Sequence, residues 1–157
     1  MTEILKLIDY HLWATDLVTN QVLNLPEEKV TKEVGGSFPS IRLTLEHLLF
    51  ADYLWMNRFT GTPNVDPPAT WGTLAEMIVR WRDVQRQLRE AAMVIAQRSE
   101  KEYKFITRSG TPHELPFLDI ILQIVNHGNY HRGQIANMIR IQGEKPVGTD
   151  YFLFCVK

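Results

Sequence analysis

Hydrophobic positions recur every three to four residues in four long stretches of this chain, which is the spacing of helices with one apolar face. Glycine and proline interrupt the spacing between these stretches. The pattern predicts four long helices, over residues 2–24, 41–60, 73–99 and 117–142. Four long helices in a chain of this length predict an all-α four-helix bundle, with residues 1–157 forming a single domain.

Capping residues support the starts of two of these helices. Ser40 is suited to cap the second helix, because its hydroxyl accepts a hydrogen bond from a free backbone N–H of the first turn. Thr73 and Glu76 have the spacing of a capping box for the third helix, although Thr70 would allow it to begin one turn earlier. The helix boundaries are therefore predicted from local chemistry as well as from periodicity.

Three shorter segments lie between and after the helices. Pro26, followed by two glutamates, predicts a short helical turn after the first helix. Residues 101–116 place β-favouring residues before a Ser-Gly-Thr-Pro turn, so a short hairpin is expected before the fourth helix. Residues 147–157 are apolar enough to dock on the domain, and Cys155 is expected to be buried there rather than catalytic.

Composition and charge exclude several classes of function. The net charge is −1, so the chain has no basic excess to neutralise nucleic-acid phosphates. One cysteine excludes an internal disulfide and argues against a cysteine-based metal cluster. No apolar run approaches the roughly 20 residues of a membrane span, and no signal-peptide pattern opens the chain. We therefore expect a cytoplasmic protein with neither nucleic acid nor a membrane as partner.

The most specific local feature is the segment His127-Gly-Asn-Tyr-His131. Histidines four residues apart share one helix face, and this pair falls on the apolar side of the fourth helix, with Arg132 on the polar side. His47 lies on the apolar face of the second helix. Three inward imidazoles from two helices either meet at one metal ion or are hydrogen-bonded core residues. Gly128 stands where a His-Glu-x-x-His zinc peptidase has its glutamate, which disfavours that mechanism.

Several motifs follow one another in a fixed order along nearly the whole chain. They are Tyr10-x-x-Trp13-Ala14, Ser40-Ile41-x-x-Thr44-Leu45-x-His47, Ala51-Asp52-x-x-Trp55, His127-x-x-x-His131-Arg132-Gly133-Gln134 and, near the end, Gly143, Pro146 and Asp150. In order and spacing they resemble the DinB/YfiT-like family of metal-dependent proteins. The resemblance implies a four-helix bundle with a long crossover, near residues 60–70, between the second and third helices. It also implies a divalent ion, zinc or nickel, held by His47, His127 and His131.

The resemblance extends to chemistry, because some relatives are transferases or isomerases that use low-molecular-weight thiols. Three neutral ligands leave the ion its full Lewis acidity, and the His-x-x-x-His segment has no carboxylate to act as base for water. A small external thiol that attacks an electrophilic substrate is the favoured mechanism. Water activation in a hydrolase, with Asp52 or Glu46 as base, is a second possible mechanism. Two hypotheses without catalysis stay open as well: a metal-binding or stress-response bundle without turnover, and a structural dimer whose histidines are only core residues.

Four further residues near the motifs have plainer expected roles. His11, where relatives often carry asparagine, is expected to be a partly buried structural residue rather than to line the mouth of a pocket. His113 is expected to be solvated in a loop. Gln123 and Gln134 flank the histidine pair, and they either orient a ligand or belong to a polar rim.

The fourth helix has a second apolar group beside the histidine face. Its members are Leu118, Leu122, Val125 and Ala136. The combined apolar arc is wider than a helix packed on a single core requires. Either neighbouring helices and the C-terminal tail cover it or another subunit does, and we expect a homodimer.

Overall fold

Helices form most of the computed structural model, which describes residues 2–62, 65–98 and 102–157. The long helices are α1 (Thr2–Leu23), α3 (Ile41–Phe59), α4 (Leu74–Ala96) and α5 (Phe117–Ile141), and the short ones are α2 (Glu27–Thr31) and α6 (Tyr151–Cys155). The strands β1 (Glu102–Ile106) and β2 (Pro112–Pro116) pair antiparallel, with Tyr103 opposite Leu115. The all-α prediction, with a short helical turn after the first helix and a hairpin before the last long one, is confirmed at this level.

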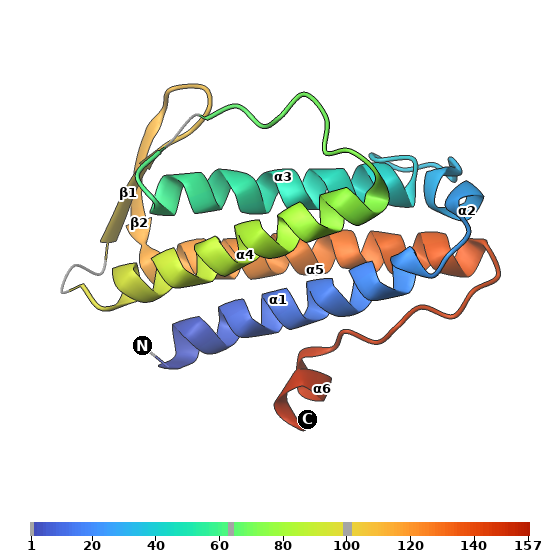
Figure 1. The fold of residues 1–157 in the computed structure, drawn as a ribbon. Helices are drawn as coiled ribbons and strands as arrows, with labels where there is room; N and C mark the ends of the chain where they lie inside the picture. The colour runs from blue at the N-terminus through green and yellow to red at the C-terminus, as the bar shows by residue number, and fades with distance from the viewer. Residues whose placement is uncertain (1, 63–64, 99–101) are drawn as a thin grey trace.

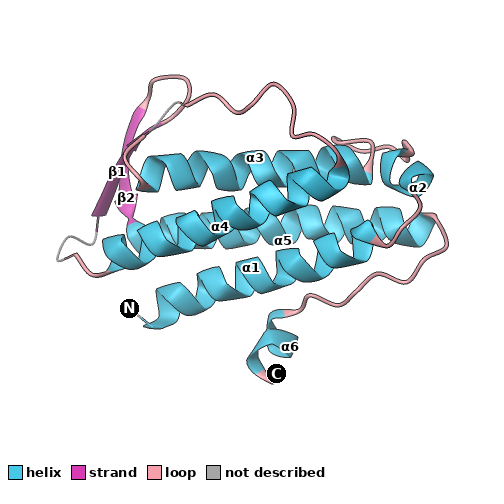
Figure 2. Ribbon diagram, in the orientation of Figure 1, coloured by secondary structure: helices cyan, strands magenta, loops and turns pink. Residues whose placement is uncertain are grey.

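The four long helices lie side by side, and each has two of the others as neighbours (Figure 1). α3 packs on α4 and α5, and α1 packs on the same two helices. α3 and α4 run in one direction while α1 and α5 run in the other, because the chain returns along the helices between α3 and α4. The hairpin stands at one end of the long helices and α2 at the opposite end (Figure 2).

The predicted capping residues begin α3 and α4. The Ser40 hydroxyl accepts a hydrogen bond from a backbone N–H in the first turn of α3, 3.2 Å away. Thr73 and Glu76 form the reciprocal capping box at the start of α4. α4 ends at Ala96, and Ser99, where its end was predicted, lies outside the described residues.

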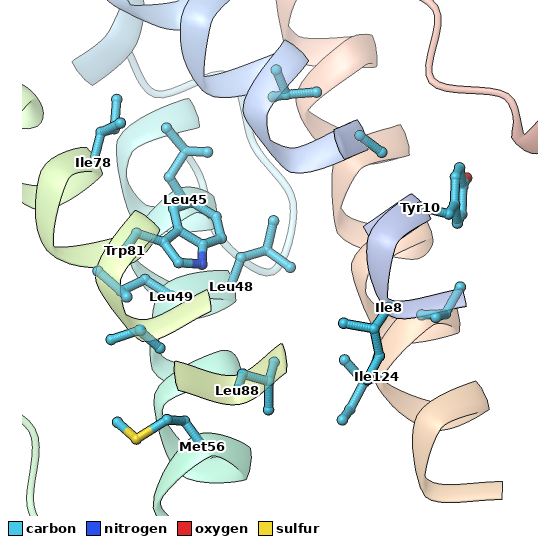
Figure 3. Close-up of a cluster of buried hydrophobic side chains, with 14 of the residues drawn as sticks. Ile8, Tyr10, Leu45, Leu48, Leu49, Met56, Ile78, Trp81, Leu88 and Ile124 are labelled. Atoms are coloured by element: carbon cyan, nitrogen blue, oxygen red, sulfur yellow. The ribbon is translucent and has the colours of Figure 1, made fainter. Parts of the chain in front are cut away.

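Buried apolar side chains fill the space between the long helices, and Figure 3 shows a part of them. Each long helix contributes to this core; examples are Ile8, Leu45, Leu48, Leu49, Ile78, Trp81, Leu88 and Ile124. Trp81 has the largest of the fully buried side chains. The core brings the inner faces of α3 and α5 together, and these are the two helices that carry the predicted metal ligands.

The C-terminal segment docks as expected but folds into a helix that the sequence pattern did not predict. In α6, the rings of Tyr151 and Phe154 contact the ring of Tyr10 on α1, with centroids 5.0 and 5.7 Å apart. The prediction that Cys155 is buried was wrong, because the thiol is exposed. α6 places Phe154 against α1, and the next residue along so short a helix is left in solvent.

The second apolar group of α5 divides between core and surface. Val125 is buried, whereas Leu118 and Leu122 remain 42% and 37% exposed. The C-terminal tail docks on α1 and leaves these two leucines uncovered.

None of the helices in the described ranges combines the length and apolar content that a membrane span requires.

Candidate metal centre

Three histidines from two helices converge at one place. His47 projects from α3 and the pair His127 and His131 from α5, and one ring nitrogen of each lies within 4.8 Å of the others. The Nε2 atoms of His47 and His127 are 3.1 Å apart. The structure thus brings together the three residues that the sequence predicted as ligands, and we call this group the histidine triad.

The triad forms because two local geometries coincide. Residues four apart on α5 stack along one face, so the rings of His127 and His131 have centroids only 4.5 Å apart. α3 packs directly against α5, which puts the ring of His47 at 4.5 Å from that of His131 and 5.0 Å from that of His127. Side chains from packed, rigid helices hold such a constellation better than loops do.

A phenylalanine that the sequence analysis missed covers one side of the triad. Phe38 stacks on His47 with ring centroids 4.2 Å apart and meets His131 edge-on at 5.7 Å. Its loop turns through Gly35 and Gly36, whose φ angles of 94° and 99° favour glycine. The Gly-Gly pair before an aromatic residue was the available signal, but spacing alone does not show where such a loop folds back.

Gln134 fixes the orientation of one candidate ligand. Its Oε1 lies 2.7 Å from Nδ1 of His131 and accepts a hydrogen bond from the N–H there. Nε2 of His131 is then unprotonated, and its lone pair is available to bind a metal ion. Of the two roles that the sequence left open for this glutamine, the structure supports the orienting one. Gln123 is exposed and belongs to the polar surface of α5.

Crowding favours the neutral, metal-binding form of two members of the triad, His47 and His127. Burial lowers the pKa of His127 to about 4, and the neighbouring rings of His131 and His47 add to the effect. Burial, and after it the charge on His131, also lowers the pKa of His47. Neutral imidazole is the ligand form, so protons compete less for the nitrogens of His47 and His127 than for those of an ordinary histidine.

We expect the metal-free protein to lose stability as the pH falls from about 6.5 to about 4. Over this range His127 stays neutral in the folded chain but protonates in the unfolded one, so protons favour unfolding. Above the ordinary histidine pKa the full stability is present. Urea denaturation in the presence of a chelator at pH 7.5, 5.5 and 4.5 measures the fall. His127→Asn should reduce it, and an identical fall in the variant would contradict the assignment.

A second polar cluster, fully buried, lies beside the triad and centres on Asp52. Asp52 is 2% exposed, and its carboxylate accepts hydrogen bonds from Nε2 of His11 at 3.0 Å, Nε1 of Trp81 at 2.7 Å and Nε2 of Gln85 at 3.1 Å. Burial alone would raise the pKa of Asp52, but His11 and these donors hold it below its usual value. Asp52 is therefore a buried ionised carboxylate whose oxygens are already occupied.

His11 and Arg132 complete this buried cluster. Nη1 of Arg132 lies 3.3 Å from Nδ1 of His11 and donates to the Thr15 hydroxyl at 3.1 Å. The structural role favoured for His11 fits, but its side chain is 1% exposed, so it is fully rather than partly buried. Arg132, expected on the polar side of its helix, is buried instead. The helical wheel assigned Arg132 to the polar side because it does not show the partners on neighbouring helices, which here are His11 and, through it, Asp52.

The fifth histidine lies outside both clusters. His113 is exposed, as expected, but it is part of β2 rather than of a loop. Its ring stacks on Phe105 of β1 with centroids 5.5 Å apart. The two residues face each other across the hairpin, which accounts for the contact.

Comparison with known proteins agrees with the motifs. Residues 1–156 match the sequence profile of the DinB family. The chain is also 31% identical, over 157 residues, to Protein DinB of Bacillus subtilis (strain 168), and the match covers 95% of this chain and 91% of that relative. Both matches extend over nearly the full length of the chain, which confirms the resemblance seen in the motifs. The chain therefore belongs to the DinB family.

Proposed function

We propose that this chain binds a divalent metal ion at the histidine triad and acts as a metal-dependent enzyme of the thiol-transferase type. The observation that carries the proposal is the convergence of His47, His127 and His131, whose ring nitrogens lie within 4.8 Å of one another. The donor set fits such an ion, since neutral imidazole suits zinc and nickel, the two ions that we propose. Three protein ligands also leave a position open for water or substrate.

The choice of a thiol follows from the groups that surround the triad. A divalent ion at this place supplies Lewis acidity and lowers the pKa of a coordinated thiol or water. Asp52 is buried and already accepts three side-chain donors, and Glu46 accepts a hydrogen bond from Arg42 at 2.7 Å. Asp52 is thus enclosed by its donors, and Glu46 pairs with Arg42 rather than with a histidine of the triad, so both are poorly placed to take a proton from a water at the triad. A small thiol with a pKa near 8.5 ionises without such a base, which favours it as the nucleophile.

Turnover tests this proposal. Metal-loaded protein is incubated with several low-molecular-weight thiols and a halogenated aromatic electrophile, and the rate is compared with that of the uncatalysed reaction. We expect acceleration with at least one thiol and its loss in the His47→Ala variant. Rates equal to the uncatalysed one for every thiol would favour a metal-binding bundle without turnover instead.

Metal analysis tests the ion itself. Anomalous scattering at the zinc and nickel edges, from crystals grown with each ion, should give a peak at the histidine triad. Protein that takes up neither ion would show that the three histidines are core residues of a structural bundle.

We also propose that the chain forms one four-helix bundle domain of the DinB/YfiT-like type and that it is a homodimer. Leu118 and Leu122 are both more than a third exposed on α5, and the C-terminal tail does not cover them. A second copy is the remaining cover for this part of the helix. Light scattering at micromolar concentration should give twice the mass of the chain, and the mass of a monomer would refute the dimer.

A further inference from the structure

The buried cluster around Asp52 connects the two helices that carry the histidine triad. We propose that His11 is a positioning residue, which sets the separation of α3 and α5 and thereby the separation of the three histidine ligands. This inference rests on the proposed metal function. It concerns a side chain that does not touch the triad and that belongs to α1, a helix without any of the three ligands.

The connection runs from α3 through α1 to α5. Asp52 of α3 accepts a hydrogen bond from Nε2 of His11 on α1, and Nδ1 of the same ring lies 3.3 Å from Nη1 of Arg132 on α5. All three residues are no more than 2% exposed. Hydrogen bonds to charged groups contribute more than neutral ones, and a buried charge left without its partner is costly. The two charges therefore hold both helices to the ring between them.

The chemistry of its neighbours explains why a histidine suits this position. The guanidinium of Arg132 only donates hydrogen bonds, so Nδ1 of His11 must be the acceptor and Nε2 must carry the proton. Nε2–H then points at the Asp52 carboxylate, which only accepts. The neutral ring thus donates on one side and accepts on the other, at opposite edges of a rigid plane. An apolar side chain of similar size would satisfy neither charge.

The cluster lies close to the ligands along both helices. Asp52 follows His47 by five residues on α3, and Arg132 directly follows His131 on α5. Between His127 and His131, Gly128 allows the ring of His11 to lie against the backbone of α5; a Cβ there would be only 2.5 Å from Nδ1 of His11. A shift of this ring would therefore move the segment of α5 from which both ligands project.

The same carboxylate offers a matched control. Gln85 of α4 is also buried and donates to Asp52, at 3.1 Å, but α4 holds no member of the triad and lies outside the connection between α3 and α5. Gln85→Leu removes one donor from Asp52, as His11→Met does, without breaking that connection. His11→Gln is the conservative variant, because its amide can donate to Asp52 and accept from Arg132.

The experiment measures the affinity for Zn²⁺ by competition with a chromophoric chelator, and urea denaturation of each metal-free variant in parallel. Without denaturant, a variant that is merely less stable but still folded keeps the native geometry and so the native affinity. We expect His11→Met to bind Zn²⁺ about tenfold more weakly, at the lower end of the loss caused by removing a group hydrogen-bonded to a metal ligand, because His11 acts through the backbone of α5 and not on a ligand directly. Gln85→Leu should remain within about twofold of the parent, and His11→Gln should recover most of the loss.

The outcomes separate this inference from the function on which it rests. Equal affinities for His11→Met and Gln85→Leu, with Zn²⁺ still bound by the parent, would overturn the inference alone. A parent protein that does not bind Zn²⁺ would overturn the proposed function and the inference with it. Should His11→Met fail to fold, Thr15→Val replaces it, because it removes a single hydrogen bond between α1 and Arg132. A weaker affinity in that variant supports the inference, and an unchanged one overturns it.

Discussion

Replacement of Gly128 by alanine is expected to destabilise the folded protein by about 2 to 3 kcal/mol. A Cβ at this position would lie 2.5 Å from Nδ1 of His11 and 2.7 Å from Nη1 of Arg132. Both side chains are buried and hydrogen-bonded, so neither moves without breaking a bond to Asp52 or Thr15. This steric cost exceeds the gain of up to about 1 kcal/mol that alanine normally brings to a helix interior.

The same substitution five residues along the same helix should have the opposite sign. A Cβ on Gly133 would meet nothing within 4 Å, and the residue is exposed. Gly133→Ala is therefore expected to stabilise the protein by about 0.5 to 1 kcal/mol. Urea denaturation of the parent and both variants, with a chelator present, gives the two differences directly. If both substitutions stabilised the protein, the close approach of His11 to Gly128 would be refuted.

The long helices were predictable because their signals are local. Hydrophobic spacing is set by the helical repeat itself, and Ser40 and Thr73 cap helices through bonds to residues three positions away. The end of the chain was not predictable in the same way. α6 is only five residues long, and contacts with Tyr10, more than 140 residues distant, hold it in place. Local pattern contains no information on such a contact, which is also why the exposure of Cys155 was predicted wrongly.

In the candidate site, too, the features set by local spacing were predictable and those set by the packing of helices were not. His127 and His131 were predictable as a pair, since four residues bring two side chains to one helix face, and His47 added a third inward imidazole. The partners of these side chains were not predictable. Phe38 contacts the triad because its glycine-containing loop folds back over the histidines. Arg132 is buried because it contacts His11, which in turn donates a hydrogen bond to Asp52 on another helix. Periodicity identifies a face, whereas the partner on that face depends on how four helices pack.

Removal of one histidine of the triad is expected to weaken Zn²⁺ binding by roughly 100-fold or more. Loss of a group that is hydrogen-bonded to a metal ligand typically costs 10- to 100-fold in metal affinity. Loss of a ligand itself removes a bond to the ion and should cost at least as much. The effect should be similar for His47→Ala and His127→Ala, because each donates one nitrogen to the same group. Both side chains are half-buried, so their removal leaves the packed core between the helices largely intact.

The chain provides its own control for this measurement. His113 is an exposed histidine on β2, outside the triad, and His113→Ala should bind Zn²⁺ as the parent does. Competition with a chromophoric chelator at pH 7.5 measures all three variants, and circular dichroism establishes that each is folded. Loss in the two triad variants alone assigns the ion to the triad. Equal affinity in all three variants would place the ion elsewhere on the protein, because no site that uses His47 and His127 as ligands survives their removal unchanged.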